Sequence, residues 1–258
     1  MKLLNLNIYM KIDNNEKIIQ YINENSFDIV TFQESMRALD DSVFPMYNSS
    51  NIIKNNILYK NSFFGPLYVS DKFIKNGIVT RDFGGFVEQG NELITNYKIV
   101  SATNHFIHND YGLFINTDNF RVNDHGRAFT DVLLDLDGEL LQIINIHGIW
   151  NENKLGDLRT INQINSLLLK VRDDIPSIVV GDFNLLPNSL SISIVNRRMK
   201  NLIEEYNIKN TRYGTENMIC DYVFVNNKIK VNDFRVVDSD ISDHLPIILD
   251  FDIIKKNY

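Results

Sequence analysis

The segment Ser242-Asp243-His244-Leu245-Pro246 places a carboxylate next to an imidazole, directly before an apolar run. A carboxylate can hold a metal ion, and an imidazole beside it can take a proton from water or bind an anion. Alone, Asp243-His244 is a common surface dipeptide. It becomes informative if other segments of the chain supply the remaining parts of a site.

Further polar side chains stand where an apolar run of the sequence begins or ends. Each is next to a predicted strand, and loops at strand ends on a rigid sheet are where catalytic groups gather. These positions are Asn7, Glu34, His147, Asp182, Asn184 and Asp221. Chance would rarely produce so regular a placement. We therefore interpret them, together with Asp243 and His244, as one constellation.

The residue types of this constellation suit one chemistry. Carboxylate and amide oxygens are hard ligands that prefer Mg²⁺ or Mn²⁺, and no cysteine or histidine spacing typical of zinc occurs in the sequence. Two separate histidines suit a phosphoryl centre. One can hydrogen-bond a nonbridging oxygen, and the other, oriented by a carboxylate, can take a proton from water. The set indicates metal-assisted attack of water on a phosphate.

Hydrophobic periodicity predicts the elements that must position these residues. Alternation predicts a strand over residues 2–9, and helical spacing predicts a helix over 14–25. An apolar run predicts a buried strand over 28–32 that ends at Gln33-Glu34. A strand–helix–strand order favours neighbouring parallel strands.

The rest of the chain alternates short strands with one strong helix. Asp137-Gly138 between two β-rich runs predicts a hairpin, and apolar spacing predicts a helix over 155–171. Residues 36–76 show scattered apolar runs and turn signals. The predicted strands cover residues 78–81, 93–95 and 99–106, with glycine-containing turns between them, then 129–136, 140–147, 178–180, 222–225, 229–236 and 247–251.

Length, charge and cysteine content limit the number of domains, the partners and the compartment that we expect. The 258 residues, 44% hydrophobic and without a linker or repeat, predict one domain over residues 1–258. The net charge of -7 argues against a basic nucleic-acid-binding face, although a bound metal could supply the missing positive charge. The single Cys220 indicates a reducing compartment and a buried small side chain. Without an apolar run of ~20 residues or a leader pattern, we expect a cytoplasmic monomer with no membrane insertion.

Seven segments, taken together and in order, resemble the endonuclease/exonuclease/phosphatase superfamily, which has the deoxyribonuclease-I-like fold. The segments are residues 1–8, 32–34, 90–95, 145–148, 181–187, 221–225 and 242–246. The resemblance runs from residue 2 to about 252. It implies an α/β fold, a four-layered α/β/β/α sandwich with two mixed sheets packed face to face and helices outside. It also implies a phosphodiesterase or phosphatase that uses Mg²⁺ or Mn²⁺.

The resemblance also implies roles for the metal-binding and acidic residues. Glu34 would be the principal metal ligand, with Asn7 and Asp243 near it. Asp182 and Asn184 would position the attacking water or a second metal.

For the remaining residues, the resemblance implies contact with the phosphate. His244, oriented by Asp221, would be the general base or a phosphate partner, and His147 would bind and polarise the scissile phosphate. Arg127 would contact phosphate or a catalytic carboxylate. Asn91 is expected to line the cleft. Trp150, just past His147, is expected either to flank the cleft as a stacking platform or to be a half-buried loop anchor. His105, His108 and His125 have no motif partner, and we expect them in loops or on the surface.

Three functions follow, in order of preference. The first is a metal-dependent nuclease or phosphodiesterase with nucleic acid as substrate, favoured because the pattern at Asn145 and His147 resembles the deoxyribonuclease and sphingomyelinase branches. The sphingomyelinase hypothesis is weakened because the sequence has no evident secretion signal or apolar hairpin. The second is a phosphatase for a small phosphorylated metabolite or lipid headgroup. The third is a catalytically inactive binding protein on the same fold.

Overall fold

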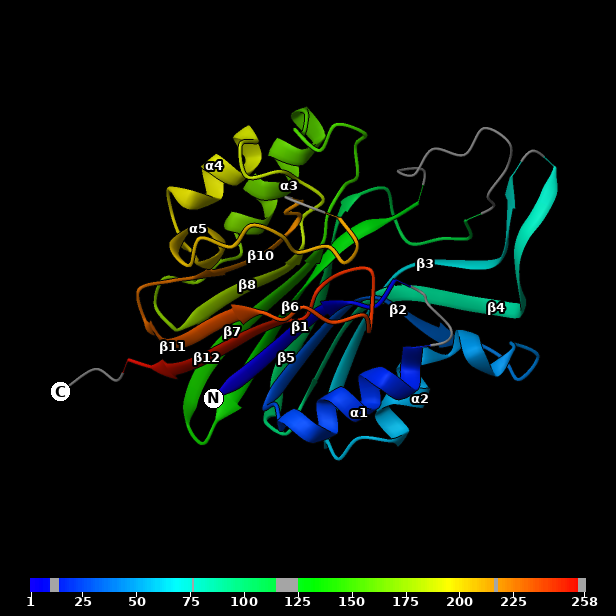
Figure 1. Cartoon of the computed structure of the whole chain (residues 1–258), viewed down its shortest axis with the longest axis horizontal. Helices are drawn as coiled ribbons and strands as arrows, with labels where there is room; N and C mark the ends of the chain where they lie inside the picture. Colours follow the sequence, from blue (N-terminus) through cyan, green and yellow to red (C-terminus); the bar gives the residue numbers. More distant parts are fainter. Residues whose placement is uncertain (10–13, 76, 115–124, 216–217, 255–258) are drawn as a thin grey trace.

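Two sheets form the centre of the molecule, and Figure 1 shows helices on both of its sides. The computed structural model describes residues 1–9, 14–75, 77–114, 125–215 and 218–254. Within them the first sheet has the order β11 (Ile229–Val236), β12 (Ile247–Ile253), β1 (Lys2–Asn7), β2 (Ile29–Ala38), β4 (Ile78–Thr95) and β3 (Asn61–Lys75). The second has the order β5 (Lys98–His108), β6 (Arg127–Leu136), β7 (Glu139–His147), β8 (Ser177–Asp182), β10 (Asp221–Val225) and β9 (Lys200–Asn201).

Both sheets are mixed, as predicted. β1 and β2 are parallel in the first sheet and β7 and β8 are parallel in the second, while the other strand pairs are antiparallel. Figure 1 places α1 (Asn15–Asn25) and α2 (Ser49–Asn55) on one side of the sheets, and α3 (Leu158–Leu168), α4 (Leu190–Asn196) and α5 (Leu202–Glu205) on the other. A short 3₁₀ turn, η2, covers Pro45–Tyr47. This is the predicted four-layered sandwich. Among the described helices, none combines the length and the apolar character needed to cross a membrane.

Strand β1 shows why four layers form. Successive side chains of a strand point to opposite faces. Leu3 packs into the core that contains both sheets, and Leu4 packs with Ile18 and Ile22 of α1. All four side chains are buried. Because residues on both faces of the strand are buried, one face must be covered by the second sheet and the other by a helix.

The long β3–β4 hairpin differs from the prediction. Strand β4 is continuous over Ile78–Thr95, so the two short strands predicted over 78–81 and 93–95 are parts of one strand. Its partner β3 was not predicted, because register shifts interrupt the alternation on which the prediction depends. The hairpin extends away from the rest of the molecule (Figure 1) and exposes Ile78 and Val79 near its tip.

Helix α3 covers Leu158–Leu168 and is shorter than predicted at both ends, and a capping box fixes its start. The Asp157 carboxylate accepts hydrogen bonds from the backbone nitrogens of Arg159 (2.8 Å) and Thr160 (3.3 Å). In return, the Thr160 hydroxyl accepts from the Asp157 nitrogen at 3.0 Å. The helix therefore begins at Leu158 rather than at the predicted residue 155.

Gly181 in β8 is needed where β7 and β8 come close together. Its φ is +138°, and a Cβ there would lie 2.1 Å from the Ile146 carbonyl oxygen. We expect Gly181→Ala to destabilise the protein by about 3 kcal/mol or more, because strand β7 would have to move. Urea unfolding of the purified variant measures this. Gly138→Ala is the matched control, since Gly138 also has positive φ (+100°) but has nothing within 4 Å. Equal losses in both variants would contradict the close-approach argument.

His125 lies in a loop just before β6, as expected, but it is buried rather than on the surface. Its ring lies 4.3 Å from Tyr68 and 5.0 Å from Phe114, centroid to centroid, and Nδ1 is 3.0 Å from the Gly126 carbonyl oxygen. Burial, assisted by the charge of Arg127, lowers the pKa of His125 to about 3.

Acidification is therefore expected to destabilise the fold through His125. In the unfolded chain, His125 binds a proton below its ordinary pKa of about 6.5. In the folded protein, His125 binds this proton only below about pH 3. Between these two pKa values, the free energy of unfolding falls by about 1.4 kcal/mol for each pH unit of acidification. Urea unfolding of wild type and His125→Asn between pH 7.5 and 5 tests this, because other titrating groups cancel in the difference. Parallel pH dependences of the two proteins would contradict the assignment.

Candidate active site

Three predicted site residues lie in one row at an end of the second sheet. His147 is the last residue of β7 and pairs in register with Asp182, the last residue of β8. Asp182 in turn pairs with Asp221, the first residue of β10. The strand pairing therefore brings together residues that are far apart in the sequence.

The first sheet contributes Asn7 and Glu34 to the same place. The Asn7 amide nitrogen lies 3.2 Å from Glu34 Oε1 and 3.2 Å from Asp182 Oδ2, and it donates to both. His147 Nε2 lies 3.7 Å from the same Glu34 oxygen and 3.9 Å from the same Asp182 oxygen. All of these side chains are buried except that of Glu34, which is 14% exposed. The site thus spans the two sheets.

Glu34 lies in a strained bulge. Strand β2 was predicted to end at Gln33-Glu34 but continues to Ala38, with the register against β4 shifted between Phe32 and Ser35. Glu34 has φ +58°, a left-handed conformation whose cost is about 1–3 kcal/mol for a non-glycine residue. Bulges often redirect a side chain next to an active site. Here the bulge accompanies the carboxylate that contacts Asn7.

His244 is held by a carboxylate, as predicted. Its Nδ1 lies 2.9 Å from both carboxylate oxygens of Asp221, and its Nε2 lies 3.7 Å from Asp182 Oδ2. Burial opposes the charged imidazole, but the charge and hydrogen bond of Asp221 outweigh it and raise the pKa of His244. The Thr211 hydroxyl also donates to Asp221, at 2.8 Å. This arrangement fixes the orientation of the imidazole and suits proton transfer at Nε2.

The carboxylates of Glu34 and Asp182 would be stabilised by a bound cation. Burial raises the pKa of Glu34, against the opposing effects of His244 and Asn7. Burial and the charge of Asp221 raise the pKa of Asp182. Buried anions this close together are stabilised by a positive charge, and oxygen donors suit Mg²⁺ or Mn²⁺. The residues present therefore fit the divalent metal that the sequence predicted.

A second group with metal-ligand spacing is better explained as support for His244. Within the described part of the chain, ligand atoms of Cys220, Asp221 and His244 lie within 4.8 Å of one another. Burial raises the pKa of the Cys220 thiol well above its usual range, and a protonated thiol is a poor ligand. The thiol instead donates to Asp221 at 3.4 Å. Cys220 is fully buried, as predicted.

Asn184 meets a lysine that the sequence did not single out. Its backbone nitrogen donates to Asp182 Oδ1 at 2.8 Å, and its side-chain oxygen accepts from Lys154 Nζ at 2.9 Å. Lys154 Nζ also lies 5.9 Å from the centroid of the half-buried Trp150 ring. Lys154 lies in a polar loop without a motif, so periodicity offered no signal for it.

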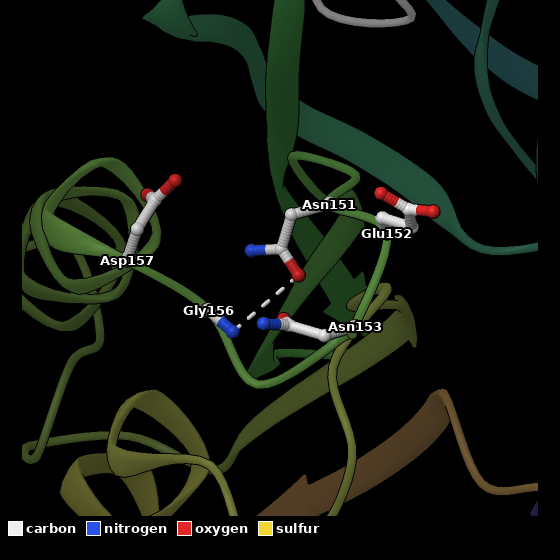
Figure 2. A pocket seen from close by; sticks show the side chains of 5 residues that line it. All are labelled: Asn151, Glu152, Asn153, Gly156 and Asp157. Carbon is white, nitrogen blue, oxygen red and sulfur yellow. Dashed lines mark hydrogen bonds between the residues drawn. The ribbon is translucent and has the colours of Figure 1, made fainter.

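A pocket of about 260 Å³ lies in the same loop (Figure 2). Its lining consists of Asn151, Glu152, Asn153, Gly156 and Asp157. Asn151 Oδ1 accepts from the Gly156 nitrogen at 3.4 Å, and Asp157 is the helix cap described above. These polar groups serve the loop itself, and the predicted catalytic residues do not line the pocket.

Arg127 and His147 leave buried polar atoms without partners in the described structure. These atoms are Arg127 Nε and Nη1 and His147 Nδ1. Burial lowers the pKa of the Arg127 guanidinium, and the charges of Glu34 and Asp182 act against this effect. Burial, then the charge of Arg127, lowers the pKa of His147 well below its usual range. A guanidinium and a neutral imidazole with unused hydrogen-bonding capacity suit recognition of an anion.

Asn91 is more deeply placed than a cleft residue. It is fully buried, and its amide nitrogen donates to the Ala128 carbonyl oxygen at 3.0 Å across the two sheets. Its side-chain oxygen has no partner in the described structure. Contact of Asn91 with substrate stays a prediction.

Asp243 is engaged by Arg212, which the sequence did not reveal. Arg212 Nη2 donates to Asp243 Oδ2 at 2.6 Å, and Nη1 contacts His244 Nε2. The charge of Asp243 reaches Glu34 and contributes to raising its pKa. Arg212 stands nine residues before Asp221 in a loop, and only the folded chain brings it to His244.

Comparison with known proteins settles the family. The model of the Endonuclease/Exonuclease/phosphatase family matches residues 4–244, a range that includes every predicted site residue. The chain belongs to this family. The family groups nucleases with phosphatases, and both hydrolyse phosphoester bonds. Membership therefore places the protein among the phosphoester hydrolases, and it confirms the resemblance stated from the sequence.

Solved structures share the endonuclease/exonuclease/phosphatase fold. A family protein from Beutenbergia cavernae has a TM-score of 0.78 and 16% identity, over 98% of this chain and 71% of that one. The human Nocturnin catalytic domain with a bound sulfate anion has a TM-score of 0.68 and 17% identity, over 98% and 94%. A Bacteroides thetaiotaomicron mannosyl-6-phosphatase has a TM-score of 0.67 and 14% identity, over 98% and 100%. A search of curated proteins gave no match.

Proposed function

We propose that the protein is a divalent-metal-dependent phosphodiesterase, with nucleic acid as the favoured substrate. One observation carries the proposal: the Asp221–His244 pair faces Asp182 in the same site that holds Glu34 and Asn7. Glu34 and Asp243 would hold Mg²⁺ or Mn²⁺. Asn7 would join them through its side-chain oxygen, which here accepts from the Tyr9 nitrogen at 2.9 Å. When bound, the metal would supply positive charge against the charge that develops on the phosphate.

The protein's own residues account for the proton and the orientation of the reactants. His244 Nε2 takes the proton of the attacking water, while Asp221 holds Nδ1 and stabilises the imidazolium that forms. Asp182, whose carboxylate is fixed by the Asn184 backbone, orients this water. His147 and Arg127 hydrogen-bond the nonbridging oxygens. The water attacks phosphorus opposite the leaving oxygen, the bond between phosphorus and the leaving oxygen breaks, and the leaving oxygen takes a proton from solvent.

A phosphomonoesterase is the second candidate. The charge of Lys154 acts on Asp182, and the charge of Asp182 acts on Arg212. Two cations beside the site suit the doubly charged phosphate of a monoester.

An inactive binding protein is disfavoured by the energetics of the site. The left-handed backbone at Glu34 and the clustered buried carboxylates both destabilise the fold. Strained backbone of this kind gathers at functional sites, and a scaffold has no need of Glu34, Asp182 and His244 together.

The test is hydrolysis of a substrate panel with Mg²⁺ or Mn²⁺. The panel contains single- and double-stranded DNA, RNA, a generic phosphodiester and a phosphomonoester, with Glu34→Gln and His244→Ala run alongside. Cleavage of diesters by wild type alone supports the proposal. Cleavage of only the monoester replaces it with the phosphatase. Equal trace hydrolysis by all three proteins contradicts both.

A further inference from the structure

The loop before β10 holds the backbone of Arg212 against the segment that carries Asp243 and His244. The Tyr213 nitrogen donates to the Asp243 carbonyl oxygen at 2.8 Å, and the Leu245 nitrogen donates to the Thr211 carbonyl oxygen at 2.9 Å. Arg212 therefore forms an antiparallel bridge with His244.

Asn210 braces the same loop internally. Its amide nitrogen donates to the carbonyl oxygens of Arg212 (2.6 Å) and Thr215 (2.8 Å). Its side-chain oxygen accepts from the backbone nitrogens of Arg212 (3.3 Å) and Met218 (3.2 Å). The backbone of Arg212 is thus fixed at the site, and only its side chain is free to change partners.

The Arg212 guanidinium contacts two atoms that the proposed reaction needs, His244 Nε2 and Asp243 Oδ2. An arginine can only donate, so its contact with His244 Nε2 occupies the lone pair that would take the proton of water. Its 2.6 Å bond to Asp243 Oδ2 occupies an oxygen predicted to bind metal. Both contacts must be given up during turnover.

A displaced guanidinium needs a new anion. The Arg212 side chain is 26% exposed, and its buried Nε already lacks a partner in the described structure. A largely buried cation without a counter-charge is strongly unfavourable. The anion that arrives when the site fills is the phosphate of the substrate, and guanidinium binds phosphate through two parallel hydrogen bonds.

We propose that Arg212 exchanges partners: it neutralises Asp243 and covers His244 in the unliganded protein, and it binds the substrate phosphate once metal and substrate enter. This inference depends on the proposed function. It makes Arg212 both a competitor of the metal and a ligand of the phosphate, and these two effects have opposite signs.

Calorimetric titrations that involve no turnover test the exchange. Arg212→Met is expected to bind Mn²⁺ alone more tightly than wild type, because the competing cation is gone. In saturating Mn²⁺ the same variant is expected to bind inorganic phosphate roughly tenfold more weakly or worse, as for loss of a hydrogen bond between charged groups. The affinities of Arg212→Lys for Mn²⁺ and for phosphate should lie between those of wild type and Arg212→Met. Lysine keeps the positive charge but loses the paired donors.

Arg159→Met is the matched control, because Arg159 Nη2 also lies 2.6 Å from a carboxylate, that of Asp157, outside the site. It should change neither titration. Weaker or unchanged Mn²⁺ binding by Arg212→Met would show that Arg212 only holds Asp243 in place, and unchanged phosphate binding would also overturn the proposal. Absence of hydrolysis in the substrate panel would instead contradict the proposed function, and the titrations would still decide the role of Arg212.

Discussion

Replacing Glu34 with glutamine is expected to lower kcat/KM by about 1000-fold or more, a loss of about 4 kcal/mol of transition-state stabilisation. Glu34 Oε1 is the oxygen that contacts both Asn7 and His147. An amide keeps the shape of the side chain but removes the negative charge that would hold the metal. Steady-state kinetics at saturating Mg²⁺ measure the loss.

The same substitution is expected to leave the protein as stable as wild type or more stable. Burial and the charges of Asp182 and Asp243 disfavour the ionised Glu34, and glutamine relieves that repulsion. Urea unfolding without metal measures this second effect. Lower stability together with lower activity would indicate simple damage to the fold.

Glu92→Gln provides the matched control for Glu34→Gln. Glu92 is fully buried on β4, but it accepts hydrogen bonds from Ser35 (2.6 Å) and Ser50 (2.7 Å) and lies 3.6 Å from Lys54 Nζ. Removing this satisfied charge is expected to destabilise the fold, because Lys54 loses its partner. Its effect on kcat/KM should be far smaller than that of Glu34→Gln. A larger loss of kcat/KM in Glu92→Gln than in Glu34→Gln would contradict the role of Glu34 as the metal ligand.

Replacing His244 with alanine is expected to lower kcat by about 100- to 10,000-fold, the usual range for loss of a general base. Asp221→Asn should produce a smaller loss, because the imidazole remains but its tautomer and orientation are no longer fixed by a carboxylate. Thr211→Val removes a donor to Asp221 and should have the smallest effect of the three. A kcat for His244→Ala within tenfold of wild type would contradict the proposed base.

The pH profile distinguishes the role of Asp221 from general structural damage. A base must be unprotonated, so kcat should fall as the pH drops through the pKa of His244. Asp221 raises this pKa against the effect of burial. In Asp221→Asn the acidic limb of the profile should therefore move to lower pH, while the plateau falls. A limb that stays in place would show that Asp221 does not act through His244.

The fold could be predicted where local patterns agree with tertiary structure. Alternation in β1 sends Leu3 and Leu4 to different layers, and Asp137-Gly138 forms the predicted hairpin. Strand pairing then places His147, Asp182 and Asp221 in one row, as their positions at strand ends suggested. The alternation and the turn depend on local sequence, and the sequence also marks the strand ends, whereas the row itself is formed by pairing of distant strands.

Other features depend on distant partners. Glu34 lies in a bulge whose position is set by pairing with β4, and no local signal marks a left-handed glutamate. Arg212 and Lys154 reach the site from loops, where periodicity carries no information. His125 is buried by Tyr68 and Phe114, which come from other segments. These residues could be placed only once the chain was folded.

The position of bound Mn²⁺ decides whether Glu34 belongs to a metal site. Crystals grown with Mn²⁺ and inorganic phosphate can be measured at the manganese absorption edge, where an anomalous difference peak locates the ion independently of activity. We expect a peak in contact with the Glu34 carboxylate, with the phosphate between the ion and His244. A peak elsewhere, or full manganese occupancy that leaves Glu34 without contact, would contradict the proposed metal-dependent site.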